Sequence, residues 1–253
     1  MRLFGSGLLW GTPLTNAAGA AIANPSPLLF GTLQDCEVEA KFEIKKLHGQ
    51  LQFPVEATRG KGSITFKAKA ADIYGGYLET IVFGQAGSAG LVSAVYDTVG
   101  TAVPATPYQI TVTPPASGVF AADLGVIDST TGRPLTRVAS APATGQYSVT
   151  VGGQYTFAAA DTAKVFYINY RYTATSAVAR KGTIANLPMG YAPTFRADLY
   201  VPYAGGSMIF TFNRAITDGM KFGFKNDDFT IPEFGGEFFA DVAGNLGTWS
   251  TTE

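Results

Sequence analysis

The sequence predicts an all-β fold: a β-barrel or sandwich with a short helix and an elaborated insertion in the middle of the chain. Two runs of alternating polar and apolar residues, 36–45 and 63–70, carry this prediction, because successive side chains of a strand point to opposite faces. The 30 glycines, 14 prolines and 13% aromatic residues are typical of strands joined by many turns. A length of 253 residues allows one large all-β domain or two smaller ones.

The first part of the chain is rich in glycine, alanine and proline. We expect residues 1–27 to form an extended arm or loop that is ordered by contact with a neighbour. Its apolar stretch follows a basic residue, as in a signal peptide, but three glycines and a proline interrupt it. An arm is therefore favoured over an export signal.

The first alternating run predicts a strand with one dry face and one charged face. The second run, 63–70, repeats the pattern with Lys67 and Lys69 on its polar side. Together the two runs describe a large two-faced sheet. In the first run the apolar positions are Cys36, Val38, Ala40, Phe42 and Ile44, and the charged positions are Glu37, Glu39, Lys41, Glu43 and Lys45.

The segment Arg59–Ser63 joins the two runs and contains two glycines and two cations. It lacks the spacing of a nucleotide phosphate loop and leads into a strand instead of a helix. We predict that it is a hairpin turn with exposed cations. After the second run, apolar residues at helical spacing predict a short helix near Gly75 and Gly76, at the end of a first β block, 28–83.

Residues 84–163 differ in composition, because small and turn-forming residues dominate over a few short strand candidates. This composition predicts a long elaborated hairpin or a small inserted β module. Residues 164–253 return to long alternating strands. We therefore expect 28–83 and 164–253 to build the main barrel or sandwich, with 84–163 inserted between them.

The sequence offers little catalytic or metal-binding chemistry. The single cysteine, Cys36, falls on the apolar side of a strand, and the single histidine, His48, falls in a polar turn. One cysteine excludes a disulfide within the chain, and a zinc site of the usual type needs more ligands. A catalytic triad would need a Gly-x-Ser-x-Gly elbow, which the sequence lacks. We expect a protein that is not an enzyme and has no metal or cofactor.

Charge and hydropathy limit the classes of partner that the chain can have. A formal net charge of −1 does not indicate a nucleic-acid binder, and no apolar run reaches the length that spans a bilayer. Charged residues make up only 15% of the chain, which is typical of a surface that partner subunits cover.

Two further groups of residues have a functional and a structural interpretation. The acids near the C-terminus could bind calcium or magnesium, but their spacing fits no known ligand loop, so polar turns are favoured. Six tyrosines could stack on sugars or bases, but packing at strand or subunit interfaces is favoured. The first group is Asn226–Asp228, Glu233, Glu237 and Asp241, and the second is Tyr167, Tyr170, Tyr172, Tyr191, Tyr200 and Tyr203.

Three groups of segments resemble the tail tube proteins of long-tailed bacteriophages. The resemblance covers about half of the chain, lies in sequence style and in a Gly-Gln-x-Gln-Phe-Pro block, and leaves residues 84–144 unmatched. The groups are Phe30–Asp35 with Lys45–Val55 and Arg59–Lys69; Gly145–Tyr147 with Gly153–Asp161 and Tyr167–Thr173; and Asn226–Phe234 with Phe239–Thr248.

The resemblance implies a structural subunit of the virion. Six β-barrel or sandwich subunits would join their sheets into a ring, and stacked rings would make the hollow conduit for genome ejection. The implied partners are the chain itself and the tape measure, tail terminator and tail tip proteins, with DNA as transient cargo and no membrane. Assembly would take place in the cytoplasm of the host bacterium, and the finished protein would belong to the phage tail.

Within this interpretation, two groups of charged residues are candidate functional positions. Glu37, Glu39 and Glu43 would face the lumen, where acidic groups repel DNA phosphate and let the genome slide, although two lysines share that face. Lys61, Lys67 and Lys69 would meet acids of the next subunit or ring.

Three other functions stay open. The chain could be a capsid decoration or other head protein, or the tube protein of a contractile injection machine. A different class is a β-sandwich carbohydrate-binding module or adhesin, which would need an exposed aromatic platform. The last is a hydrolase that uses paired carboxylates on an all-β scaffold.

Overall fold

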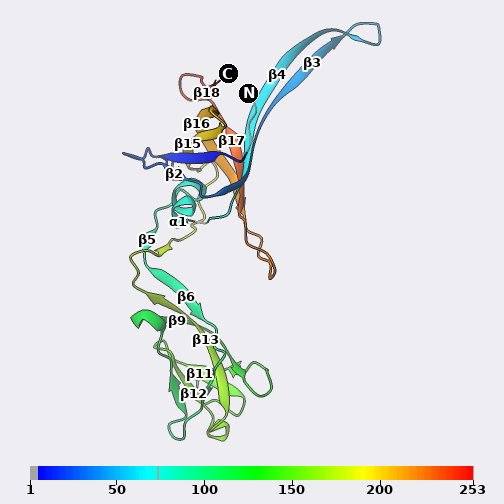
Figure 1. Cartoon of the computed structure of the whole chain (residues 1–253). Coiled ribbons are helices and arrows are strands. Elements are labelled where there is room, and N and C mark those ends of the chain that lie inside the picture. The colour runs from blue at the N-terminus through cyan, green and yellow to red at the C-terminus, as the bar shows by residue number, and fades with distance from the viewer. Residues whose placement is uncertain (1–4, 73, 253) are drawn as a thin grey trace. The chain divides into compact units, whose positions relative to one another are not determined.

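The computed structural model describes residues 5–72 and 74–252, in two compact units. Unit 1 comprises residues 1–87 and 182–253, and unit 2 comprises residues 88–181. Strands dominate both units, and helical segments are few and short, which confirms the all-β prediction (Figure 1).

Unit 1 is built on one antiparallel sheet of eight strands. Its order is β2-β1-β15-β16-β17-β4-β3. In addition, β18 pairs with residues 208–212 of β16, whereas β17 pairs with residues 215–221 of the same strand. The strands are β1 (Leu8–Thr15), β2 (Leu28–Leu29), β3 (Leu33–His48), β4 (Pro54–Ala70), β15 (Thr194–Tyr203), β16 (Gly206–Lys221), β17 (Glu233–Phe238) and β18 (Gly247–Thr251).

The core of unit 1 lies between one face of this sheet and a short helical segment. Residues Gly75–Tyr77 form α1 and Leu78–Val82 continue it as the π-helical turn η1, where the sequence predicts a short helix. Ile81 of η1 is fully buried, and phenylalanines from neighbouring strands stack beneath it, with ring centroids of Phe66 and Phe238 5.0 Å apart. Gly11 is required on β1, because a Cβ there would lie 2.6 Å from the Phe30 ring.

The sequence predicts an extended arm over residues 1–27 that a neighbour orders, but part of this segment belongs to the sheet of unit 1. Leu8–Thr15 forms β1, which pairs with β15, and Leu9 is buried in the core. Residues 1–4 lie outside the described residues. Pairing inside the sheet, and not a neighbouring subunit, therefore fixes β1.

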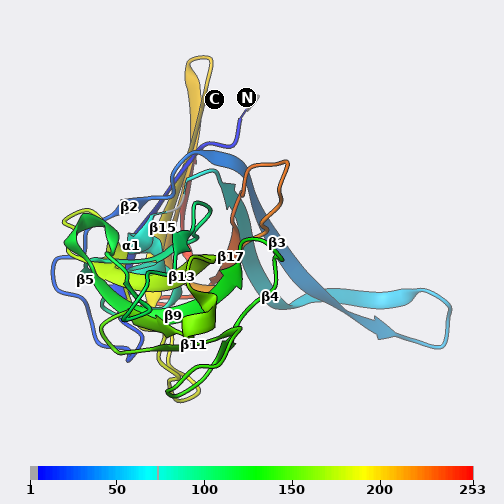
Figure 2. The ribbon, with the colours of Figure 1, turned by 90° about the horizontal axis from the view of Figure 1, so that it is seen from below.

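The hairpin of β3 and β4 is much longer than the rest of the sheet. β17 covers β4 only from Ile64 to Lys69, so beyond Ile64 the two strands continue as a two-stranded ribbon (Figures 1 and 2). From here on, "the arm" means residues 40–63 of this hairpin and not the N-terminal segment 1–27. In unit 1, Figures 1 and 2 both show the arm curving away from the sheet.

The predicted hairpin turn at Arg59–Ser63 is wrong. This segment lies inside β4, where a register shift sets Phe42 opposite Gly62 and Ile44 opposite Arg59. A β-bulge accommodates the extra residue on β4, so the glycines bend the strand without reversing it. The chain reverses instead between His48 and Pro54.

Unit 2 is a β-sandwich with an aromatic core. One sheet has the order β10-β11-β12-β8, and in the other β13 pairs with β6, β7 and β9. Its elements are β5 (Ser88–Ala89), β6 (Leu91–Val95), β7 (Thr101–Ala102), β8 (Gln109–Thr111), η2 (Pro115–Ser117), β9 (Val119–Asp128), β10 (Thr136–Arg137), β11 (Gln146–Val149), β12 (Gln154–Phe157), η3 (Ala159–Asp161), β13 (Val165–Ala174) and β14 (Arg180–Lys181).

The inserted module therefore ends later than the expected boundary at residue 163. β13 belongs to unit 2, because its Phe166, Tyr170 and Tyr172 are buried against that unit's core. β14 pairs with β5, with Arg180 opposite Ala89, so the chain enters and leaves unit 2 at adjacent points.

A phenylalanine in the core should contribute much more to the free energy of unfolding than a phenylalanine on the arm. Phe66→Ala should lower the free energy of unfolding of unit 1 by about 3–5 kcal/mol, because Phe66 is 3% exposed. Phe53→Ala at the arm's tip, where the ring is 79% exposed, should change it by less than about 0.5 kcal/mol. Urea unfolding of both variants tests this. Equal losses would contradict the packing described above.

Candidate assembly surface

The arm exposes several large apolar side chains. They are between 50% and 80% exposed, and a concentration of large exposed apolar groups on one hairpin is typical of an interaction site. The predicted dry face is thus present at the base of β3 but not along the arm. The residues are Phe42, Ile44, Leu47, Leu51, Phe53 and Val55.

Two of these residues, Phe42 and Ile44, form a row that begins at the core, because they lie on the same face of β3 as its partly buried positions. Cys36 and Val38 on β3 and Ile64 on β4 are partly buried against the core of unit 1. Phe42 lies four residues beyond Val38 on the same face of the strand and is half exposed. The Arg59 guanidinium lies 4.5 Å from the centroid of its ring, a cation–π contact. The exposed row is therefore an extension of the core surface that lacks a covering layer.

The opposite face of the sheet carries charges in cross-strand rows. Asp35 on β3, Lys69 on β4, Glu233 on β17 and Lys221 on β16 stand opposite one another in register. The Lys69 Nζ lies 3.8 Å from an Asp35 carboxylate oxygen and 3.6 Å from one of Glu233. Exposed pairs of this kind contribute about 0–1 kcal/mol each, so they balance charge more than they stabilise the fold.

The structure sets one of the three predicted lumen-facing acids opposite one of the three predicted contact lysines. Glu37 stands directly opposite Lys67, and Glu39 is one row further along, where the Lys41 Nζ lies 2.8 Å from its carboxylate. Glu43 and Lys61 lie on the arm and are exposed. Alternation predicts the face on which each residue lies, but only the strand register shows which acid meets which lysine.

Beside these rows the sheet surface is hollowed. Gly219 of β16 stands opposite Gly235 of β17, and the missing side chains leave an open groove of about 520 Å³. Its walls are the charged residues Asp35, Glu37, Lys67, Lys69, Asp218, Lys221 and Glu233. Among residues 5–72 and 74–252, no group of three or more His, Cys, Asp and Glu is arranged to hold a metal ion.

The single cysteine and the single histidine both lie on β3. Cys36 is partly buried, and burial, with a smaller contribution from the Asp35 charge, raises the pKa of its thiol to about 11. The thiol is therefore protonated at neutral pH and a weak nucleophile. His48 is the last residue of β3 and is exposed beside the reversal of the hairpin.

The prediction of polar turns for the C-terminal acids holds at Asp241 but is wrong for Glu233 and Glu237, which lie in strand β17. Asp241 accepts hydrogen bonds from the backbone N–H groups of Ala243 and Asn245, both at 2.9 Å, and from the side-chain amide of Asn213 at 2.7 Å. Of the tyrosines, Tyr170 and Tyr172 are buried in the core of unit 2. Asp241, Tyr170 and Tyr172 therefore match the structural interpretation, whereas Tyr191 and Tyr203 are exposed.

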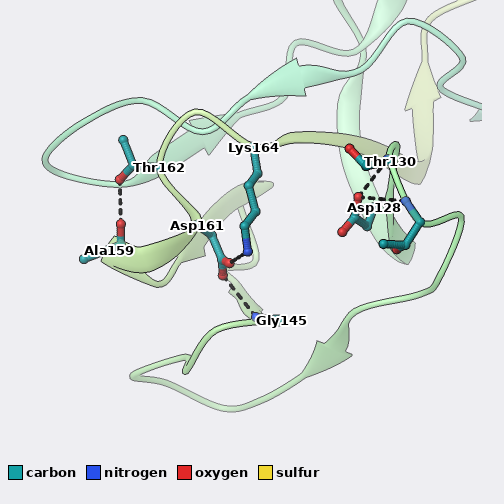
Figure 3. Close-up of polar contacts among 8 residues, drawn as sticks. Asp128, Thr130, Gly145, Ala159, Asp161, Thr162 and Lys164 are labelled. Atoms are coloured by element: carbon teal, nitrogen blue, oxygen red, sulfur yellow. Dashed lines mark hydrogen bonds and ion pairs between the residues drawn. The ribbon is translucent and has the colours of Figure 1, made fainter.

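Two acids of unit 2 with buried carboxylates also have structural roles, one at a turn and one between strands. Asp161 is fully buried, and its two carboxylate oxygens accept hydrogen bonds from the Lys164 ammonium at 2.7 Å and the Gly145 N–H at 3.1 Å (Figure 3). Asp123 accepts hydrogen bonds from the hydroxyls of Tyr147 and Tyr155, at 2.7 and 3.0 Å. Lys164 is only three residues after Asp161, but the other partners, Gly145, Tyr147 and Tyr155, are 16 to 32 residues from the acids they contact, so local patterns did not reveal these arrangements.

No family model matches the chain, and a search of curated proteins finds no match. In the described part of the chain, no helix is long and apolar enough to cross a membrane.

The turn at Asp241 predicts a specific dependence on pH. Hydrogen bonds, first from the Asn245 N–H, lower the pKa of Asp241 below its ordinary value of 3.8. A lowered folded pKa contributes stability above the unfolded pKa, and this contribution is lost as the pH falls through the folded pKa. Asp241→Asn should therefore be less stable than the unmodified chain at pH 7, with the difference shrinking below about pH 4. Urea unfolding at pH 7 and pH 2.5 measures this, and a difference independent of pH would exclude the effect.

Proposed function

We propose that this chain is a self-assembling structural subunit, the major tail tube protein of a long-tailed bacteriophage. The proposed product is a stack of hexameric rings that forms the hollow conduit for genome ejection. The observation that carries the proposal is the exposed arm, and the sequence resemblance supplies the kind of assembly.

The arm needs a partner for physical reasons. An isolated two-stranded hairpin is at best marginally stable in water, and the arm leaves several large apolar groups exposed. Burying one such side chain fully contributes about 1.5–3 kcal/mol, so seating the arm on another subunit would supply a substantial part of an assembly free energy. Copies of the same chain would supply that covering layer in a ring or between rings.

The edge of the sheet supports the same conclusion. Among the described residues, β3 has one strand neighbour, β4, so its other edge has no strand partner along its 16 residues. Joining that edge to the sheet of a neighbouring subunit would pair its backbone groups and close a ring. The charged side chains that alternate along β3 disfavour indiscriminate pairing with other strands.

The charged face suits a conduit for DNA. Acids and lysines alternate across β3, β4, β17 and β16, so the face combines both signs and carries no basic patch that would hold phosphate. In the proposed tube, Glu37, Glu39 and Glu43 would face the lumen beside these lysines. The tape measure, tail terminator and tail tip proteins would be further partners.

Charging the arm should block assembly without unfolding the subunit. Phe42→Glu with Ile44→Glu places two carboxylates on the exposed apolar row, where they would be desolvated on docking. Negative-stain electron microscopy of concentrated protein should show rings or tubes for the unmodified chain and none for the double variant. Val151→Glu, at an exposed turn of unit 2, is the matched control and should assemble normally. Monomers from the unmodified chain at every concentration, followed by binding to capsids or to a glycan array, would favour a decoration protein or a carbohydrate-binding module.

Two of the three candidate lysines, Lys61 and Lys69, are expected to differ in their effect on assembly and stability. Lys61→Glu should reduce assembly and leave stability unchanged, because Lys61 is exposed on the arm and forms no ion pair with the residues that the structure describes. Lys69→Glu would also place a third acid between Asp35 and Glu233 and so destabilise the subunit itself. Sedimentation of assembled material, measured beside urea unfolding, separates the two effects. Unimpaired assembly of Lys61→Glu would exclude an inter-subunit role for that lysine.

A further inference from the structure

Unit 2 has a strand edge that its own fold leaves unpaired. β6 pairs with β13 along one side, and no strand within residues 5–72 and 74–252 pairs with its other side. Such an edge presents backbone N–H and C=O groups that can receive another strand.

The edges that β8, β10 and β9 form in unit 2 are protected. β8 has three residues and lies between Pro107 and Pro114, and β10 has two residues, one of them Arg137. β9 contains two register shifts against β13, and the Leu135 N–H donates to the Val126 carbonyl at 2.9 Å on its other side. Short length, proline, charge and bulges are the usual means by which proteins prevent edge pairing.

β6 has none of these features. Its sequence, Leu-Val-Ser-Ala-Val, contains no charge, proline or glycine, and all five residues pair with β13 without a register shift. Leu91 and Val95 pack on the core of unit 2, while Val92 and Ala94 alternate with them and are exposed. The edge is therefore regular, apolar and open, a combination that is a liability unless it is paired.

We propose that β6 pairs in antiparallel orientation with β6 of a second copy of this chain. A two-fold axis at Ser93 sets Leu91 opposite Val95 and Val92 opposite Ala94, so every cross-strand pair is uncharged. Arg171 stands opposite Ala94 on β13. The two copies of Arg171 would be three strand spacings apart, roughly 14 Å, which avoids a clash of like charges. This contact is separate from the proposed ring and does not depend on it.

Cross-linking at β6 tests the pairing in the full chain. The variant Cys36→Ala with Ala94→Cys carries a single thiol, and under the proposed register the two thiols are diagonal neighbours, with Cα atoms about 7–8 Å apart. A short bismaleimide should convert most of this protein to a covalent dimer. Val151→Cys in the same Cys36→Ala background is the control, because Val151 is 99% exposed on a turn. Cross-linking at residue 94 no greater than at residue 151 would overturn the proposal.

A charge on the edge supplies a second readout. Adding Val92→Lys to the residue-94 variant should reduce the dimer at least tenfold, and adding Val151→Lys should leave it unchanged. Circular dichroism checks that both remain folded, and an undiminished dimer in the Val92→Lys variant would overturn the proposal.

Electron microscopy separates the β6 pairing from the proposed tube. Rings or tubes without a residue-94 dimer would overturn the β6 pairing alone, and the dimer without rings or tubes would overturn the tube alone.

Discussion

The structure of unit 1 depends on the fact that β4 has two strand neighbours along part of its length and one along the rest. β17 has six residues, whereas β3 and β4 have 16 and 17. Where β17 pairs with β4, the sheet is wide enough to cover a core. Beyond Ile64 the same alternating sequence has no such layer, and its apolar side chains are exposed. The difference between core and arm is therefore one of strand length, not of residue type.

Electrostatics has a secondary role in this arrangement. The ion pairs of Lys69 are exposed and span 3.6 to 3.8 Å, so they add little to stability compared with the stacked rings of Phe66, Phe238 and Phe212 beneath them. Their effect is on the surface that the sheet presents. A face in which each cation is next to an acid has a weak field of its own, and it neither collects polyanions nor strongly repels them.

Much of the fold could be predicted from the sequence because it depends on local patterns. Alternation along 36–45 and 63–70 identified the strands and their two faces, and helical spacing identified the segment near Gly75. The hairpin reversal was misplaced because Gly60 and Gly62 are typical of turns, while a bulge can use the same residues to bend a strand. The exposure of Phe42 and Ile44 could not be predicted either, since it depends on where a distant strand, β17, ends. The predicted end of the insertion, residue 163, differs from the observed end of unit 2, Lys181, for a similar reason. β13 has the composition of unit 1 strands but packs on the tyrosines of unit 2.

The open edges of β3 and β6 carry different side chains, and this difference bears on how a chain with several pairing surfaces avoids indiscriminate association. β3 alternates charged and apolar residues, so a partner strand must match both its register and its charges. β6 has no charges and discriminates only through length and shape. Because β5 and β14 bring the chain into and out of unit 2 at adjacent residues, the insertion interrupts none of the strand pairs of unit 1. Each unit can therefore keep its own edge chemistry, and a charge change on one edge should leave pairing at the other unaffected.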